Sequence, residues 1–209
     1  YKESLFYDDR NDGCYRDLAI SFARSGELER AQTTLNKAEA LGVSGDNLSL
    51  VRGEILWKKG DAAGALQEFE RAAEMTEDDY LLYRTLTSCC AMAESAGEPE
   101  MHRRAAALLE RHRDIGGEYE YIVLDMLANE YYLCGRAEEQ TADELNKTAS
   151  TRGEAEEHRA AANGFYENAA GCYRTIYSAG KLTELEGQKY FFNLLEKLGH
   201  YDECRSLWW

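Results

Sequence analysis

Small and large residues alternate over residues 53–72 in the pattern of two short antiparallel helices. The pattern breaks at Gly60, and glycine readily adopts the backbone conformation of a tight turn. Gly53, Ala65 and Ala72 would leave room for the two backbones to approach closely. A single hairpin of this size cannot bury its own apolar face, so neighbouring copies are expected beside it.

A second copy of the pattern lies 34 residues earlier in the chain. Four pairs of residues share this offset: Gly26 and Gly60, Ala31 and Ala65, Leu35 and Phe69, and Ala38 and Ala72. A 34-residue period with these small and large positions resembles the tetratricopeptide repeat (TPR) family over roughly residues 12–79. The resemblance implies helix-turn-helix units that stack into a right-handed superhelix.

The two regular copies predict specific helices. In the first copy we expect helices over residues 13–24 and 28–40, and in the second a helix over residues 47–58. Asp61 then stands where an N-cap is needed, because its carboxylate can accept the unpaired amides of the next helix's first turn.

Beyond residue 79 the predicted helices become longer and less regular. Apolar side chains at three- and four-residue steps predict a helix over residues 79–95. Pro99 suits the first position of the next helix, because its missing N–H would be unpaired there in any case. We expect that helix to end at Gly116 and Gly117.

The fourth unit is predicted as a hairpin whose first helix ends at Gly135, followed by a more polar helix over residues 137–149. Residues 154–179 predict either one long helix or two abutting ones. An apolar helix follows over residues 182–198. Residues 201–209 predict a short capping helix or the start of a further repeat.

Together these elements predict an all-α fold, a right-handed α-α superhelix (TPR-like solenoid) of about five helical hairpins. We expect residues 1–209 to form a single domain. Its approximate repeats are residues 12–45, 46–79, 80–116, 118–150 and 154–209.

The charge of the chain narrows the class of partner. The chain has 39 acidic against 24 basic residues and a formal net charge of −15. Such a surface would repel a nucleic-acid backbone and anionic lipids, so we expect no nucleic-acid partner and a protein or peptide of basic or mixed character. No apolar run approaches the roughly 20 residues that cross a bilayer, so membrane insertion is not expected.

The six cysteines have neither Cys-x-x-Cys spacing nor a nearby histidine pair, so no zinc site or redox motif is predicted. Most of them fall at apolar helical positions, which favours reduced core residues and a cytoplasmic location. The sequence begins at Tyr1 without a methionine. We therefore expect the chain to be a segment of a longer protein, in which a signal or an anchor could precede residue 1.

No catalytic motif is apparent in the sequence. The four histidines are widely separated and are expected on helix surfaces, and there is no serine elbow or glycine-rich phosphate loop. We therefore predict no enzyme activity, no cofactor and no metal in these residues.

The resemblance to TPR proteins implies a concave groove lined by the first helix of each repeat. Trp57 and Tyr132 would be its aromatic anchors, although Trp57 could instead pack between repeats. One TPR subset binds C-terminal carboxylates through a clamp of Lys, Arg and Asn, but Ile20 and Val51 occupy two asparagine positions of that clamp. The groove candidates are Arg16, Ile20, Asn47, Leu50, Glu54, Trp57, Asp125, Asn129 and Tyr132.

The function predicted from these features is protein or peptide binding in the concave groove, without catalysis. One alternative is the regulatory or sensor arm of a larger signalling protein, such as a bacterial kinase or transcription regulator. Another is a self-assembly module in which the apolar C-terminal helices pair two copies into a homodimer.

Overall fold

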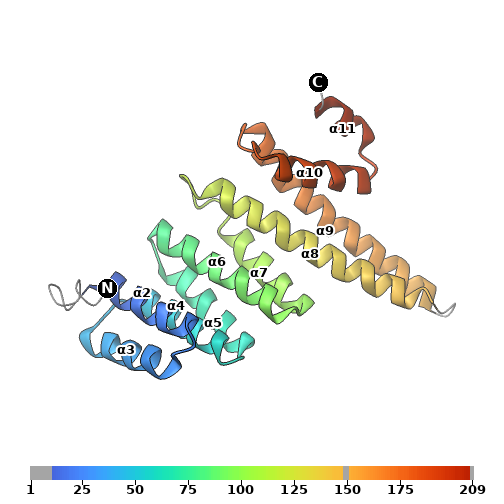
Figure 1. The fold of residues 1–209 in the computed structure, drawn as a ribbon. Coiled ribbons are helices and arrows are strands. Elements are labelled where there is room, and N and C mark those ends of the chain that lie inside the picture. Colours follow the sequence, from blue (N-terminus) through green and yellow to red (C-terminus); the bar gives the residue numbers. More distant parts are fainter. Residues whose placement is uncertain (1–10, 148–150, 208–209) are drawn as a thin grey trace. The chain divides into compact units, whose positions relative to one another are not determined.

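The computed structural model describes residues 11–147 and 151–207, and within these ranges the chain forms ten α-helices and no β-strand (Figure 1). No helix in those ranges combines the length and the apolar character that crossing a membrane requires. Contacts divide the chain into two compact units, Tyr1–Gly97 (unit 1) and Glu98–Trp209 (unit 2). Within each unit, helices that are adjacent in sequence pack against one another.

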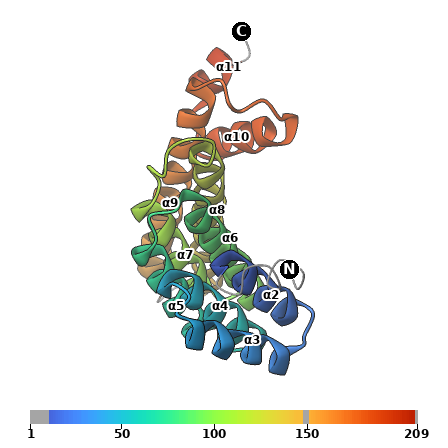
Figure 2. The same ribbon diagram turned by 90° about the vertical axis from the view of Figure 1, so that its left-hand side faces the viewer.

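Unit 1 is built from five helices in its described part. Helix α2 contacts α3 and α4, and α4 contacts α5 and α6, so alternate helices touch as well as consecutive ones. Figure 2 shows α3, α4 and α5 side by side in this unit. The helices are α2 (Asp12–Arg24), α3 (Leu28–Leu41), α4 (Gly45–Lys58), α5 (Ala62–Met75) and α6 (Asp79–Ala96).

The turns of unit 1 follow the predicted pattern. Gly26 and Gly60 have φ angles of 81° and 87°, in the left-handed region that favours glycine. The Asp61 side chain accepts a hydrogen bond from the Gly64 amide at 2.8 Å, so its predicted role as the N-cap of α5 is confirmed. The boundaries predicted for the helices of the two regular copies agree with the structure to within two residues.

Close packing explains the alternation of small and large residues in unit 1. A Cβ atom at Gly53 would come within 2.6 Å of Cδ1 of Phe69, whose side chain is fully buried. Glycine at this position therefore lets α4 and α5 approach each other. The other repeated positions are also buried: Ala31, Leu35, Ala38, Ala65 and Ala72.

Unit 2 contains a pair of long antiparallel helices, α8 and α9, which lie side by side in Figures 1 and 2. Pro99 is the first residue of α7, as predicted. The C-terminal helices α10 and α11 follow α9, and α10 packs on both of its neighbours in sequence. The bounds are α7 (Pro99–Arg111), α8 (Glu120–Leu145), α9 (Arg152–Ser178), α10 (Leu185–Lys197) and α11 (Tyr201–Leu207).

The predicted turn at Gly135 is wrong. Helix α8 continues through this glycine without a break, so no second helix begins at residue 137. Gly135 is buried, and a Cβ atom there would come within 2.6 Å of Cε1 of Tyr166 on α9. This glycine therefore provides space for an aromatic ring on the neighbouring helix and does not end its own helix.

Two other helix boundaries differ from the predictions. Helix α7 ends at Arg111, before Gly116 and Gly117, which both have positive φ angles in the following turn. Helix α10 begins at Leu185, later than the predicted start at residue 182. At two places the structure selects one of the predicted alternatives, since residues 154–178 lie in one long helix, α9, and the C-terminal segment forms the short helix α11. The end predicted at residue 149 and the tryptophans at 208 and 209 lie outside the described residues.

Candidate functional site

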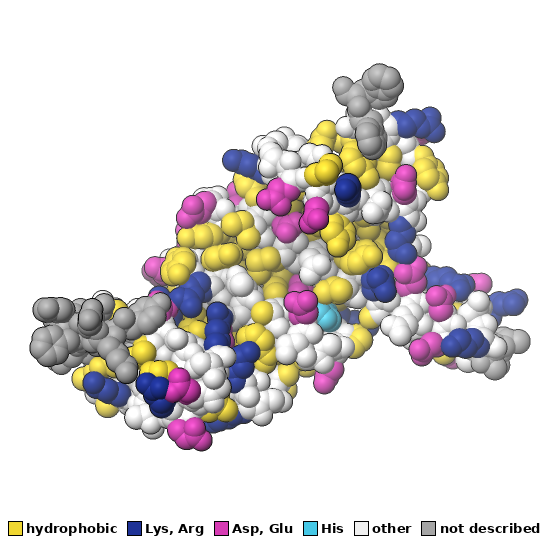
Figure 3. Space-filling model, viewed as in Figure 1, with side chains coloured by type: hydrophobic (Ala, Val, Ile, Leu, Met, Phe, Trp, Pro, Cys, Tyr) yellow, Lys and Arg dark blue, Asp and Glu magenta, His cyan; other side chains and the backbone are white. Residues whose placement is uncertain are grey.

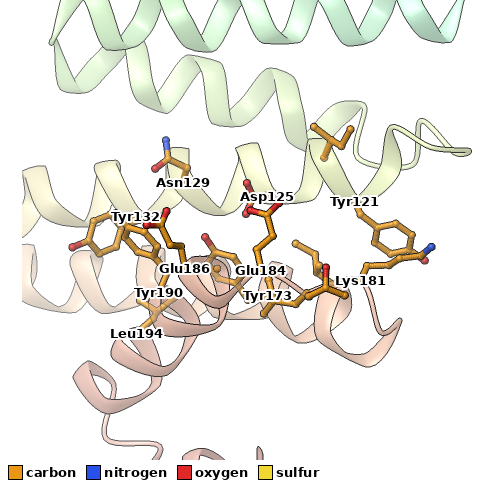
Figure 4. Close-up of a pocket in the computed structure, with 15 residues that line it drawn as sticks. Tyr121, Asp125, Asn129, Tyr132, Tyr173, Lys181, Glu184, Glu186, Tyr190 and Leu194 are labelled. Atoms are coloured by element: carbon orange, nitrogen blue, oxygen red, sulfur yellow. The ribbon is translucent and has the colours of Figure 1, made fainter.

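A cavity of about 500 Å³ lies in unit 2, between α8 on one side and α9, the segment after α9 and α10 on the other (Figure 4). Its volume falls in the range of ligand pockets, roughly 300–1,000 Å³. The lining combines tyrosines, aliphatic side chains and charged groups. Its members are Tyr121, Ile122, Asp125, Asn129, Tyr132, Tyr173, Ile176, Lys181, Leu182, Thr183, Glu184, Glu186, Gly187, Tyr190 and Leu194.

One face of α8 supplies the first wall of the cavity. Ile122, Asp125, Asn129 and Tyr132 are three or four residues apart, so their side chains leave the helix on the same side. The opposite side of α8 carries buried residues such as Leu127, which belong to the core. The amphipathic character of α8 therefore directs its polar and aromatic stripe into the cavity.

The segment between α9 and α10 is held close to the start of α10. The Gln188 side chain donates a hydrogen bond to the Leu182 carbonyl at 2.9 Å. Gly187 has no side chain to obstruct this approach, since a Cβ atom there would come within 2.9 Å of Cδ1 of Leu182. These contacts position Lys181, Leu182 and Glu184 along the cavity wall.

Asp125 lies at the centre of the site, facing both α9 and α10. It accepts a hydrogen bond from the Tyr173 hydroxyl. Burial and the nearby negative charge of Glu184 raise the pKa of Asp125 above its ordinary value, although the Tyr173 hydrogen bond opposes this shift. Burial and the Asp125 charge in turn raise the pKa of Tyr173, which therefore stays a hydrogen-bond donor at neutral pH.

The two ends of the cavity differ in their aromatic contacts. At one end, Lys181 Nζ lies 5.7 Å from the centroid of the Tyr121 ring, within the range of a cation–π interaction. At the other end, Tyr132 lies 5.7 Å from the Tyr166 ring, centroid to centroid, and forms a hydrogen bond with the Arg136 side chain. Figure 4 shows Tyr121 beside Lys181, and Tyr132 on the opposite side of Asp125.

Three of the nine groove residues predicted from sequence, Asp125, Asn129 and Tyr132, line this cavity together. No sequence pattern indicated that residues on α9 and α10 would face them. Tyr173 belongs to an apolar stripe of a long helix, and Glu184 and Glu186 have the ordinary position of acidic residues at a helix start. Only tertiary packing reveals that these residues surround one cavity.

The predicted groove residues of unit 1 lie at the packed interface of α2, α4 and α6. Arg16 donates a hydrogen bond to the Asn47 side-chain oxygen at 3.0 Å. Ile20 and Leu50 are buried in the core, with 3% and 0% exposure. In this conformation these two side chains offer no surface to a partner, and a binding role for them stays a prediction.

Glu54, another predicted groove residue, is a fully buried carboxylate with its hydrogen bonds satisfied inside unit 1. It accepts bonds from the Arg24 guanidinium at 2.5 and 3.2 Å and from the Ser88 hydroxyl at 2.6 Å. These contacts join α2, α4 and α6. Trp57 is partly buried, and Lys58 Nζ lies 3.7 Å from the centroid of its ring.

A second hollow in unit 2, of about 420 Å³, lies on α7, α8 and α9 beside Tyr131 and Phe165. Its polar groups are already paired within the chain. The Tyr131 hydroxyl donates to Glu110 at 3.0 Å, and Arg113 forms an ion pair with the same carboxylate at 2.8 Å. This hollow is therefore less suited than the cavity to recognise a polar ligand.

Three histidines of unit 2 lie within hydrogen-bond distance of glutamates: His102, His158 and His200. The prediction that all four histidines lie on helix surfaces is wrong for His102, which is buried with its Nδ1 atom 2.7 Å from Glu130. A carboxylate partner makes this burial possible because it satisfies the imidazole nitrogen. Among the residues that the structure describes, no group of three or more His, Cys, Asp or Glu is arranged to hold a metal ion.

Two cysteines of unit 2, Cys134 and Cys172, have buried thiol groups. Burial raises the pKa of Cys134 to about 12 and that of Cys172 to about 11. Both therefore remain protonated and unreactive at neutral pH, as core residues do.

No protein-family model matches the sequence, and a comparison with curated proteins also finds no match. The function must therefore be argued from the geometry and chemistry of the cavity.

Proposed function

We propose that this protein binds a segment of a partner protein, and that the cavity of unit 2 is the binding site. The observation that carries this proposal is the convergence of Asp125, Asn129 and Tyr132 from α8 with tyrosines from α9 and α10 in a single cavity. A mixture of aromatic surface and a few polar groups suits the recognition of a peptide side chain.

The space-filling view supports an accessible site. Figure 3 shows acidic side chains next to hydrophobic ones on the face of unit 2 between α8 and α10. Tyr190 is 60% exposed, and Glu186 is also exposed, so a ligand can reach both side chains from solvent. Exposed aromatic surface beside polar groups is typical of a binding surface.

We also propose that unit 1 has a TPR-like fold. The 34-residue spacing relates two hairpins, α2–α3 and α4–α5, whose turn glycines share a left-handed conformation. Contacts between the first helices of the hairpins, α2 and α4, agree with the stacking of TPR units. We propose that these hairpins wind in the right-handed sense of that family.

Binding without catalysis is the better-supported use of the cavity. Titratable groups do converge there, and the raised pKa of Asp125 is a feature that catalytic carboxylates share. However, the hydroxyl that is hydrogen-bonded to Asp125 is that of Tyr173, and its pKa is raised. Tyr173 therefore keeps its proton at neutral pH, which is the opposite of what an activated nucleophile requires.

Self-assembly is the second candidate, because the C-terminal helices expose Leu185, Tyr190 and Tyr201 at 65%, 60% and 59%. Large side chains contribute roughly 150–250 Å² each when fully buried. Three of them fall short of the roughly 800 Å² per partner that a stable interface buries. Light scattering over a hundredfold range of concentration tests this candidate, since a constant monomer mass would contradict it.

The binding proposal can be tested by selecting 12-residue peptides from a random displayed library on the immobilised full chain. Selected peptides would then be titrated against the wild type and three variants. Tyr132→Ala and Asn129→Ala remove cavity side chains, and we expect each to weaken binding about tenfold or more. Tyr201→Ala is the matched control, because Tyr201 is an exposed tyrosine of unit 2 outside the cavity lining.

Three outcomes would contradict the proposed function. The first is a selection that yields no peptide with saturable binding. The second is a set of peptides whose affinity is the same for the wild type, Tyr132→Ala and Asn129→Ala. The third is an equal loss of affinity in Tyr201→Ala and in the cavity variants, because the loss would then not be specific to the cavity.

A further inference from the structure

The lining of the cavity carries an excess of negative charge. Three carboxylates, those of Asp125, Glu184 and Glu186, face the cavity together with one ammonium group, that of Lys181. Within the ranges that the structure describes, neither Glu184 nor Glu186 has an ion-pair partner, and the Glu184 side chain makes no capping bond to α10. The negative charge of this wall is therefore not balanced inside the protein.

The centre of the cavity shows the consequence of this imbalance. Asp125 and Glu184 approach from opposite walls, and the repulsion between them contributes to the raised pKa of Asp125. A positive charge placed between the two carboxylates would reverse that contribution and stabilise both ionised forms. The ligand that best complements this point is a cation.

Aromatic rings provide the second part of the argument. A cation interacts favourably with the face of a tyrosine ring within about 6 Å of its centroid. The protein already shows this contact at one end of the cavity, where Lys181 lies over Tyr121. Figure 4 shows that Glu186 and Tyr190 lie toward the other end, away from Lys181.

Lys181 therefore neutralises only one end of the cavity. Tyr190 is 60% exposed, and its ring makes no aromatic or cation–π contact with other residues of the described chain. Glu186 and Tyr190 are both on the first turns of α10 and offer a carboxylate and a ring to the same ligand. The Tyr132 end of the cavity already has a positive charge nearby, because the Arg136 side chain forms a hydrogen bond with the Tyr132 hydroxyl. The acidic centre is therefore a better place for a ligand cation than the Tyr132 end.

We infer that the cavity accepts a positively charged side chain of the partner segment, the ammonium of a lysine or the guanidinium of an arginine. Asp125, Glu184 and Glu186 supply the opposite charge, and Tyr190 supplies the ring against which the cation lies. This inference rests on the proposed function, because it names the chemistry of the ligand at the same site. Helix-dipole effects alone explain why Glu184 and Glu186 are tolerated at a helix start, but not why Asp125 faces them.

The test uses peptides selected on the full chain as described above. We expect the selected peptides to share a lysine or arginine. Replacing a lysine with norleucine, or an arginine with citrulline, keeps the aliphatic chain and removes the charge, and we expect affinity for the wild type to fall about tenfold or more. For the Glu184→Gln/Glu186→Gln variant the same replacement should change affinity less than about threefold, because two of the three carboxylates that face the cation are gone.

A matched control separates this effect from the general loss of acidic charge. Glu154 is an exposed glutamate in the first turn of α9 and is not part of the cavity. Glu154→Gln should therefore keep the full preference for the charged peptide. Lys181→Met provides a gain-of-function arm, since it removes the competing cation and should tighten binding of the charged peptide about threefold or more.

The outcomes distinguish the two proposals. If peptides bind in the cavity but tolerate norleucine or citrulline without loss, the inference about charge is overturned while the proposed function stands. The same conclusion follows if the double glutamine variant retains the full charge preference, or if Lys181→Met weakens binding of the charged peptide. If no peptide binds, the proposed function itself fails.

Discussion

The phenol ring of Tyr166 lies directly against the backbone of Gly135, so that a Cβ atom at residue 135 would come within 2.6 Å of ring carbon Cε1. The ring cannot easily move away, because Tyr166 is 1% exposed and its hydroxyl donates to Glu139 at 2.9 Å. Gly53 and Phe69 form the same kind of contact in unit 1. Both units thus use a helical glycine to admit an aromatic ring from the next helix.

We expect Gly135→Ala to lower the free energy of unfolding by about 1–3 kcal/mol, the cost of overpacking a well-filled core. Gly164→Ala on α9 is the control, because a Cβ atom there would meet no other atom within 4 Å. This control should instead stabilise the protein by about 0.5–1 kcal/mol, since alanine favours a helix. Urea denaturation measures both effects, and a Gly135→Ala variant as stable as the wild type would show that Tyr166 can move aside.

The buried Glu54 carboxylate depends on Arg24 for its charge balance. Arg24→Met should lower the free energy of unfolding by about 1–3 kcal/mol, because it leaves a buried charge with only the Ser88 hydroxyl as a partner. Arg71→Met, at an exposed arginine of α5, should change it by less than about 0.5 kcal/mol. Denaturant titration in a double-mutant cycle with Glu54→Gln should give a coupling energy of at least about 1 kcal/mol. Additive losses in that cycle would argue against a direct interaction.

The Asp61 cap offers a smaller and more local test. Asp61→Ala should destabilise the protein by about 1 kcal/mol, because the Gly64 amide loses its acceptor at the start of α5. Asp61→Asn keeps a side-chain oxygen at the same position and should lower the free energy of unfolding by only about a few tenths of a kcal/mol. Thermal or urea denaturation can rank the three proteins. Equal losses in the alanine and asparagine variants would point to the charge of Asp61 instead of its cap.

Stability at low pH should depend on Glu138, which accepts bonds from His158 and Arg103. Burial alone would raise the Glu138 pKa, but these hydrogen bonds and charges outweigh it and hold the pKa below its ordinary value of 4.5. A lowered carboxylate pKa stabilises the folded state above the unfolded pKa. This contribution is lost as the pH falls through the folded pKa.

The difference in free energy of unfolding between the wild type and Glu138→Gln should therefore be largest near about pH 6 and shrink as the pH falls below about 4.5. Urea titrations at several pH values measure it. Glu157→Gln is the control, at an exposed glutamate that has no ion-pair partner in the described part of α9. A constant difference for Glu138→Gln down to about pH 3 would contradict the assigned shift.

Local signals determined much of the helical pattern. Gly26, Gly60, Asp61 and Pro99 act on their own backbone or on residues within one turn, so their roles follow from sequence neighbours alone. The alternation of small and large residues likewise predicted the hairpins of unit 1, because each position repeats the same packing after 34 residues.

Tertiary packing decided the features that distinguish unit 2. Gly135 has the sequence context of a turn glycine, but the ring of Tyr166 across the helix pair makes it a packing glycine inside α8. The cavity is a further case, since the resemblance to TPR proteins implied that Asp125, Asn129 and Tyr132 share one face, and all three line the cavity. Residues about 50–65 positions later complete the site, and no local rule relates them to that face, because their proximity depends on how α9 and α10 pack.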